Sequence, residues 1–209
     1  MQNKIRVLLI ENQTLTRVGI RTILGAQSDI EIVGEAASSA VGFELFKRTK
    51  PDVVILGLRF PDSCAIDDLN HYFAEYARAR IIILAEHAGD AEISKSLKKG
   101  ALGYVGKDVS ETEIVKAIRA VAAGKRYISG NIADILSENF GQEELTPSEQ
   151  KILQMIVMGK ANKEIAFDLN ISDNTVKTHV KNIFDKLNVS DRTSAATSAI
   201  KRGLVRVDL

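Results

Sequence analysis

Four polar residues near the C-terminal end of the chain are spaced to lie along one side of a helix. They are Asn174, Lys177, Thr178 and Lys181 in the segment SDNTVKTHVKNIFDKL, and at about 100° per residue they turn away from the apolar positions between them. A helix fits the major groove of duplex DNA, where lysine can donate to guanine and threonine offers a hydroxyl and a methyl group. The pattern therefore indicates a surface that could read bases.

Polar residues that flank this group suit contacts with phosphates. Asn162, Lys163, Thr175 and His179 carry hydrogen-bond donors, and phosphate contacts position a protein on DNA without reading its sequence. Charge does not decide the matter, because residues 143–209 contain ten basic and nine acidic side chains. An ordinary solvated helix face would carry lysines in the same way.

The elements that would hold these residues form a helix-turn-helix pattern. A short helix is expected over 163–169, with Ile165, Ala166 and Leu169 on its apolar side. Ser172 can cap a longer helix over 173–187, whose apolar face consists of Val176, Val180, Ile183 and Leu187. If both apolar faces pack into one core, the polar residues of the longer helix remain outside.

Further signals place these helices in an all-α domain of four helices over 145–209. Thr146 can cap a helix, Pro147 suits its first position and Glu149 completes a capping box. The helical pattern is interrupted at Gly159, at 170–172 and at 188–190. Turn-forming residues at these points divide the segment into four pieces.

The first half of the chain alternates strands with amphipathic helices. Strands are expected over 7–10, 31–34, 53–56, 81–84 and 103–105, and helices over 15–26, 39–49, 65–77, 89–99 and 110–123. Strands that are apolar throughout and separated by helices indicate a parallel sheet covered on both faces. The prediction is a five-stranded, doubly wound α/β domain over 1–124, followed by a linker over 125–144 with room for one or two helical turns.

Composition limits the class of protein further. The 209 residues are 45% hydrophobic and 26% charged with a net charge of +1, which excludes a disordered tail and a globally basic coat protein. The single cysteine, Cys64, cannot form an internal disulfide, and the apolar runs are too short to span a bilayer. Glu11 interrupts the apolar start where a signal peptide would continue. We expect a cytoplasmic protein without a membrane partner.

The segment 145–205 resembles the LuxR/FixJ-type DNA-binding domain. The resemblance rests on LTPSEQKIL, NKEIA, ISDNTVKTHVKNIFDKL and SDRTSAATSAIKRGLV, in that order. It implies that the second helix of the helix-turn-helix enters the major groove with Lys177, Thr178 and Lys181 toward the bases. It also implies a homodimer contact through the last helix, 191–202, where Ala195, Ala196 and Ala199 would allow close approach.

The first half resembles the receiver domain of NarL/FixJ-type response regulators. The strings that carry it are IRVLLIENQTLTRVGIRTIL, KPDVVILGLRFPD, IIILAEH and KKGALGYVGKD. The family holds Mg²⁺ with two acids after the first strand, where this chain has Glu11 and Asn12. It accepts phosphate on an Asp at the position of Gly57 and contacts it with a hydroxyl at the position of Ala85. The family's lysine is kept as Lys107, and an aromatic residue as Tyr104.

These departures predict that the phosphate chemistry is lost. Gly57 has no side-chain oxygen, so no acyl phosphate can form there, and Glu11 alone is a poor remnant of a Mg²⁺ site. Lys107 is then expected to form an ion pair, with Glu11 as its partner. Asp62, Asp67 and Asp68 follow the third strand and are weak candidates for a substitute acceptor.

Other chemistries find little support. GALGYVGK, residues 100–107, has glycines one position too far apart for a phosphate-binding loop and lacks its Ser or Thr. His71, His87 and His179 lack metal-ligand spacing, and Cys64 has no partner motif. No enzyme activity, metal or cofactor is predicted.

Two classes of function remain. The first is a transcription regulator that binds double-stranded DNA as a homodimer. Its receiver-like domain would work without phosphorylation, either as a dimerisation module or as a module that senses an unidentified ligand or protein. The second is an adaptor that binds another protein through the receiver-like domain. The basic positions of the longer helix favour the first class.

Overall fold

The computed structural model describes residues 4–61, 63–86, 89–138 and 143–205. The chain folds as two compact units, one built from residues 1–88 and 93–134 and the other from residues 89–92 and 135–209. Within the described ranges, no helix is both long enough and apolar enough to cross a bilayer.

The first unit contains a parallel sheet of six strands in the order β2-β1-β3-β4-β5-β6. The strands are β1 (Ile5–Ile10), β2 (Ile30–Ala36), β3 (Val53–Gly57), β4 (Ile81–Ala85), β5 (Gly103–Gly106) and β6 (Tyr127–Ile128). The prediction of five strands was wrong, because β6 pairs with β5 through Gly103 and Tyr127 and through Tyr104 and Ile128. A two-residue strand is too short to leave a hydrophobic pattern of its own.

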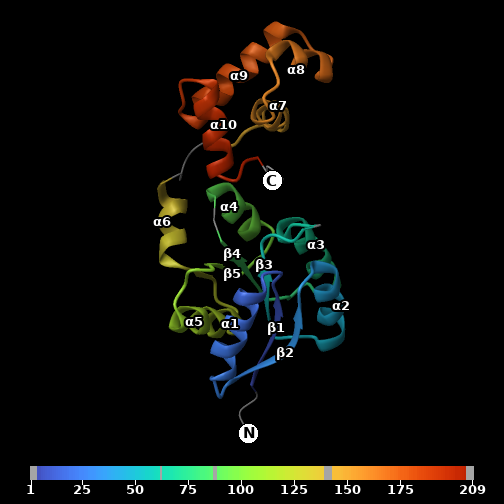
Figure 1. Cartoon of the computed structure of the whole chain (residues 1–209), viewed down its shortest axis with the longest axis vertical. Coiled ribbons are helices and arrows are strands. Elements are labelled where there is room, and N and C mark those ends of the chain that lie inside the picture. The colour runs from blue at the N-terminus through green and yellow to red at the C-terminus, as the bar shows by residue number, and fades with distance from the viewer. Residues whose placement is uncertain (1–3, 62, 87–88, 139–142, 206–209) are drawn as a thin grey trace. The chain divides into compact units, whose positions relative to one another are not determined.

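Helices cover both faces of this sheet (Figure 1). They are α1 (Thr14–Gly25), α2 (Ser39–Thr49), α3 (Ala65–Glu75), α4 (Asp90–Lys98) and α5 (Glu111–Ala122). On one face, α1 and α5 bury Ile20, Leu24, Ile114 and Ile118 against strand residues such as Val7 and Ile55. On the other face, α2 and α3 lie side by side. This arrangement buries β3 and β4 throughout, as the continuous apolar runs predicted.

The segment expected as a linker carries regular structure. It contains β6 and the nine-residue helix α6 (Gly130–Glu138). Ser129 directly precedes α6, and its side chain is buried and donates a hydrogen bond to Asn131 Oδ1 at 2.8 Å. The polar residues and glycines of this segment are typical of a loop. Its first part nevertheless forms a strand, β6, because it pairs with β5.

The second unit consists of helices where the sequence predicted them. They are α7 (Pro147–Val157), α8 (Asn162–Leu169), α9 (Asp173–Leu187) and α10 (Arg192–Lys201). The capping box is formed, since Glu149 N donates to Thr146 Oγ1 at 3.3 Å and Thr146 N donates to Glu149 Oε2 at 2.8 Å. Asn170 and Asn188 adopt left-handed conformations at the ends of α8 and α9, which asparagine tolerates better than most residues. Each asparagine therefore ends its helix where the sequence pattern breaks.

Candidate nucleic-acid interface and carboxyl-edge site

The carboxyl ends of the central strands bring four predicted residues to one edge of the sheet. The register pairs Ile10 with Leu56, Gly57 with Leu84, and Ala85 with Gly106. Glu11, Gly57, Ala85 and Lys107 therefore stand at or just beyond the ends of neighbouring parallel strands. This is the edge at which open α/β sheets usually bind their ligands.

Glu11 and Lys107 form the predicted ion pair at this edge. Lys107 Nζ lies 2.8 Å from Glu11 Oε1, and the side chains are 15% and 0% exposed. Gln13 N donates a second hydrogen bond to the same oxygen at 2.8 Å, while Lys107 N donates to the carbonyl of Ala85 at 2.8 Å. The pair therefore connects the loops that follow β1 and β5.

Gly57 lies directly against the Glu11 carboxylate. A Cβ built on Gly57 would stand 2.6 Å from Glu11 Oε2, well inside van der Waals contact. That oxygen is buried and has no hydrogen-bond partner among the described residues. The space in which a side chain at position 57 would begin is thus occupied by Glu11.

The residues at this edge do not fit Mg²⁺. Mg²⁺ prefers near-octahedral oxygen ligands that include carboxylates, but Gly57 has no side chain and the charge of Glu11 is already paired with Lys107. Among the described residues, no group of three or more His, Cys, Asp or Glu side chains could hold a metal ion. The fold places one buried carboxylate here, already neutralised by a lysine.

The other candidate residues of this half lie apart from the edge site. Asp68 accepts a hydrogen bond from Ser39 Oγ at 2.6 Å, and Cys64 is buried. Asp67 lies in the first turn of α3, whereas Asp62 and His87 fall outside the described residues. Residues 103–106 form β5, so Gly103 and Gly106 of GALGYVGK lie in a strand rather than in a phosphate-binding loop.

In the second unit, α8 and α9 form the predicted helix-turn-helix. Ser172 caps α9 by accepting a hydrogen bond from Thr175 N at 3.0 Å. On the inner side of α9, Val176 and Ile183 are fully buried and Leu187 is 6% exposed, and they pack with Ile165 of α8. Burial of this face leaves the opposite side of α9 in solvent.

The outer side of α9 carries the predicted base-reading residues. Asn174, Lys177, Thr178 and Lys181 are all exposed. Lys177 Nζ lies 2.8 Å from Asp173 Oδ2, and Thr178 Oγ1 donates to the carbonyl of Asn174 at 3.1 Å. Lys181 makes no ion pair within the described part of the chain, which leaves its charge available to a ligand.

The predicted phosphate-contacting residues differ in how available they are. Lys163 is exposed, whereas Asn162 Oδ1 accepts a hydrogen bond from Arg192 Nη1 at 3.3 Å. The Thr175 hydroxyl lies 2.8 Å from Ser172 Oγ in the cap of α9. His179 is half-buried, and its Nδ1 is enclosed with no partner among the described residues. Only the other ring nitrogen of His179 can therefore face a ligand.

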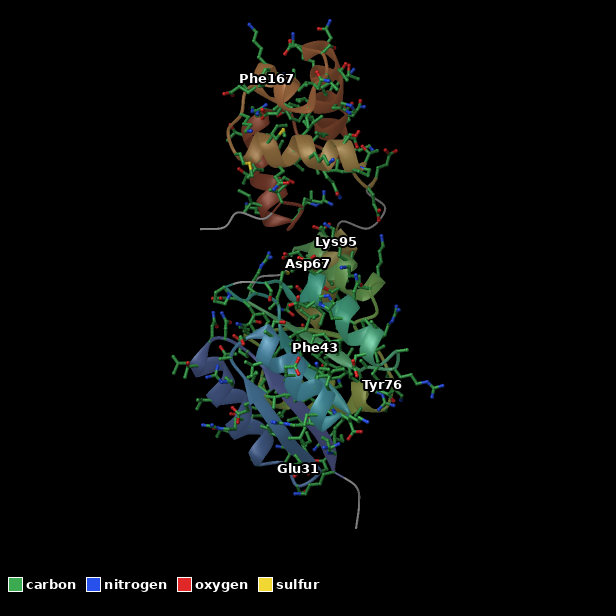
Figure 2. The ribbon with its side chains drawn as sticks, turned by 90° about the vertical axis from the view of Figure 1, so that its right-hand side faces the viewer. Glu31, Phe43, Asp67, Tyr76, Lys95 and Phe167 are labelled. Atoms are coloured by element: carbon green, nitrogen blue, oxygen red, sulfur yellow. The ribbon has the colours of Figure 1, made fainter. Side chains whose placement is uncertain are left out.

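Three residues near this surface escaped the sequence analysis. Asn182 is exposed on α9, four residues after Thr178, a spacing that could have identified it. Arg192 donates to Asn162 and to the carbonyl of Lys160, so it ties the start of α10 to α8, a long-range contact that no local pattern predicts. Phe167 of α8, labelled in Figure 2, is 86% exposed and shares a helix face with Lys163.

The alanines assigned to a dimer contact instead pack inside their own domain. Ala195 and Ala199 are fully buried in the core of the second unit, and Ala196 packs against it. That part of the prediction was wrong for Ala195 and Ala199, because small residues permit close packing within a domain as readily as between protomers. The exposed side of α10 consists of Thr193, Thr197, Ile200 and Lys201.

The electrostatics of the second unit stabilise its helix starts. Burial alone would raise the pKa of Glu149, but hydrogen bonds from Thr146 and Lys186 hold that pKa below its ordinary value. Hydrogen bonds from the side chain and backbone of Ser194 lower the pKa of Asp191, the cap of α10. Both carboxylates are therefore favoured in their charged form.

Sheet order, carboxyl-edge site and helix-turn-helix together define a two-domain response regulator. Residues 7–119 match the family described as "Response regulator receiver domain", and residues 143–199 match "Bacterial regulatory proteins, luxR family". The chain belongs to the NarL/LuxR-type response regulators, and its second domain is a DNA-binding domain of the luxR family.

Similar proteins share this organisation over nearly their whole length. The transcriptional regulatory protein MctR of Rhizobium johnstonii is 38% identical, over 97% of this chain and 96% of its own. LiaR of Bacillus subtilis is 38% identical, over 96% and 99%. The crystal structure of the response regulator ChrA is 31% identical and covers 97% of this chain and 99% of its own, with a TM-score of 0.57. These relatives are regulators rather than enzymes, in agreement with the prediction that this chain is not an enzyme.

Proposed function

We propose that this response regulator controls transcription without aspartyl phosphorylation. The observation that carries the proposal is the contact between Glu11 and Gly57. Position 57 offers no nucleophile, and Glu11 Oε2 lies 2.6 Å from where its Cβ would stand. An acyl phosphate needs a side-chain carboxylate, which position 57 lacks, and Glu11 Oε2 would have to move before a side chain could stand there.

The ion pair supports the same proposal. In a phosphorylated receiver, a lysine beyond the sheet edge can interact with the incoming phosphate, but Lys107 is bound to the buried Glu11 at 2.8 Å. A ligand shifts a conformational equilibrium only through differential affinity for two states. Lys107 is already paired with the Glu11 carboxylate. A phosphate that displaced Glu11 from Lys107 would therefore gain little interaction free energy.

The DNA-binding part of the proposal rests on the outer side of α9. Lys177, Thr178 and Lys181 are placed to contact bases, and Lys163 is placed to contact a phosphate. Asn174 and Asn182 extend the same stripe along the helix, while Asn162, Thr175 and His179 flank it. We assign base reading to the first three residues and positioning on the backbone to the flanking ones.

A homodimer follows as part of this proposal. A two-fold dimer of helix-turn-helix domains reads two half-sites about one helical turn apart. The exposed side of α10, with Ile200 at 50% exposure, offers a contact surface that the buried alanines do not.

Selection of bound sequences from a random duplex library tests this function. The unphosphorylated wild-type protein is expected to enrich one motif, with two half-sites about one helical turn apart. Lys181→Ala should lose enrichment at a defined base position, whereas Lys151→Ala, which removes an exposed lysine from α7, should not. Failure of the wild-type protein to enrich any motif at low salt would favour an adaptor and contradict the proposal.

A further inference from the structure

A cavity of about 370 Å³ lies at the amino-terminal edge of the sheet. Its wall is built from the end of α2, the loop before β3, the end of α3 and the loop before β4. Two wall residues, Asp52 and Arg80, directly precede β3 and β4, so the cavity is at the edge opposite Glu11 and Gly57. A volume of this size is within the range of small-molecule sites.

Cationic side chains dominate the charge of this wall. Two come from the end of α2 and two from the loop before β4, namely Lys47, Lys50, Arg78 and Arg80. Lys47 is paired with Glu44 at 2.6 Å. The other three make no ion pair in the part of the chain that the structure describes. Three unpaired cations therefore line one cavity.

Two carboxylates reduce this positive charge without cancelling it. Asp52 and Glu75 lie in the same wall, but among the described residues neither forms an ion pair with one of its cations. Asp52 Oδ2 instead accepts a hydrogen bond from Arg6 N at 2.8 Å. The cavity thus keeps positive charge that an anion can neutralise, while its carboxylates can accept hydrogen bonds from hydroxyl or amino groups of the same ligand.

The backbone of Lys50 gives a second, independent indication of a site. Lys50 ends α2 in the left-handed conformation, with φ 45° and ψ 64°. Glycine and asparagine tolerate this conformation best, and asparagine occupies it at the ends of α8 and α9. Backbone strain of this kind clusters at ligand sites. A lysine at this position therefore indicates that its charge has a use in the cavity.

The rest of the wall is apolar and aromatic. Phe46 is 3% exposed and Pro51 is buried, and both line the cavity. Tyr76, labelled in Figure 2, lies at the end of α3 and is 55% exposed, so its ring is available for stacking. An inorganic anion would use only the cations, and an uncharged nucleoside only the ring and the carboxylates. A nucleotide would use all three.

We propose that this cavity binds a nucleoside phosphate. Arg78 and Arg80 bind the phosphate group, because a guanidinium matches phosphate oxygens with two parallel hydrogen bonds, and Lys50 adds a third positive charge. The base stacks on Tyr76, an interaction that every base can make. The site uses none of the residues of the carboxyl-edge site or of α9, so it stands independently of the proposals on phosphorylation and DNA binding.

Amide chemical-shift titration of the full-length protein without DNA tests this site. The nucleotide probes are adenosine and guanosine monophosphate, and the competing classes are adenosine, inorganic phosphate and a hexaglutamate peptide. At least one nucleotide is expected to give saturable shifts at residues 46–52 and 75–80, with a Kd of about 1 mM or tighter. The proposal would be overturned if neither nucleotide gave such shifts, if phosphate or adenosine bound as tightly, or if hexaglutamate bound more tightly.

Matched variants separate a built site from general attraction to positive charge. Arg80→Gln should weaken nucleotide binding roughly tenfold, the effect of a lost charge-assisted hydrogen bond. Arg78→Gln changes an exposed residue and should act in the same direction even if Arg80→Gln harms the fold. Arg126→Gln is the control, because Arg126 is exposed and lies outside the wall. Equal weakening by all three variants would contradict the proposal.

A variant of the aromatic residue tests the stacking. Tyr76→Leu should weaken binding of the nucleotide at least about fivefold and leave the weaker binding of inorganic phosphate unchanged. The same affinity of Tyr76→Leu and the wild type for the nucleotide would contradict the assignment of the base to Tyr76.

Discussion

Glu11 Oε2 lies 2.6 Å from the point where a Cβ on Gly57 would stand, so the two residues are sterically complementary. Glu11 cannot easily give way, because its other oxygen is held by Lys107 and by the backbone N–H of Gln13. The absence of a side chain at position 57 is therefore matched by the conformation of its neighbour.

Gly57→Ala should destabilise the protein even though it adds only a methyl group. The new Cβ forces the Glu11 carboxylate to shift, and overpacking of this kind typically costs about 1–3 kcal/mol of the free energy of unfolding. Gly19→Ala is the matched control, because nothing lies within 4 Å of its Cβ and replacement of a helical glycine gains about 0.5–1 kcal/mol. Urea unfolding of both variants measures the difference. Equal stabilities for the two would show that Glu11 does not occupy this space.

Lys107→Met should be strongly destabilising, because it leaves the fully buried Glu11 without its cation. Breaking a buried pair by removing one partner costs about 3–5 kcal/mol. The double variant Glu11→Gln with Lys107→Met should recover part of that loss. Lys47→Met, which removes the cation of the more exposed pair with Glu44, should cost under about 1 kcal/mol. Chemical denaturation measures the free energy of unfolding of each variant. If Lys107→Met lost no more of it than Lys47→Met, the prediction would be refuted.

Lys181→Ala and Lys177→Ala should each weaken specific DNA binding by about 1–3 kcal/mol and relax preference at a defined position. Lys163→Ala should instead weaken specific and non-specific binding alike and flatten the dependence on salt. Lys177 pairs with Asp173 in the free protein. Asp173→Asn should therefore release Lys177 and tighten DNA binding. Titrations at several salt concentrations distinguish these effects. Identical behaviour of the three lysine variants would contradict the division into base and phosphate contacts.

Most of the site positions could be predicted from the sequence, because short local patterns place them. The capping box at Thr146 fixed the start of α7, and apolar spacing fixed the buried side of α9. The predictions that failed concern features that depend on tertiary packing. The buried alanines of α10 and the two-residue β6 leave no local signal that distinguishes their surroundings. The fit of Glu11 against Gly57 likewise arises from residues 46 positions apart.

Acid should destabilise the second unit through Glu149. Its pKa is lowered in the folded protein from an ordinary value of 4.5, so its stabilising contribution is complete above that value and is lost as the pH falls through the lower folded pKa. Glu149→Gln should therefore show a shallower loss of Tm below about pH 4.5 than the wild type. Lys186→Met removes one hydrogen bond to this carboxylate. Its loss of Tm on acidification should therefore begin at a higher pH than in the wild type. Unchanged acid profiles for both variants would rule out this role.

The central claim is that phosphate is not the switch, and one paired measurement tests it most directly. The wild-type protein is incubated with Mg²⁺ and a small phosphodonor, its intact mass is determined, and the same sample is titrated with its DNA site. We expect no added phosphate and an unchanged Kd. Gly57→Asp is expected to label slowly at best and to bind DNA like the wild type, because Asn12 and Ala85 still lack the groups that the family uses. Stoichiometric labelling of the wild-type protein with tighter DNA binding would contradict the account.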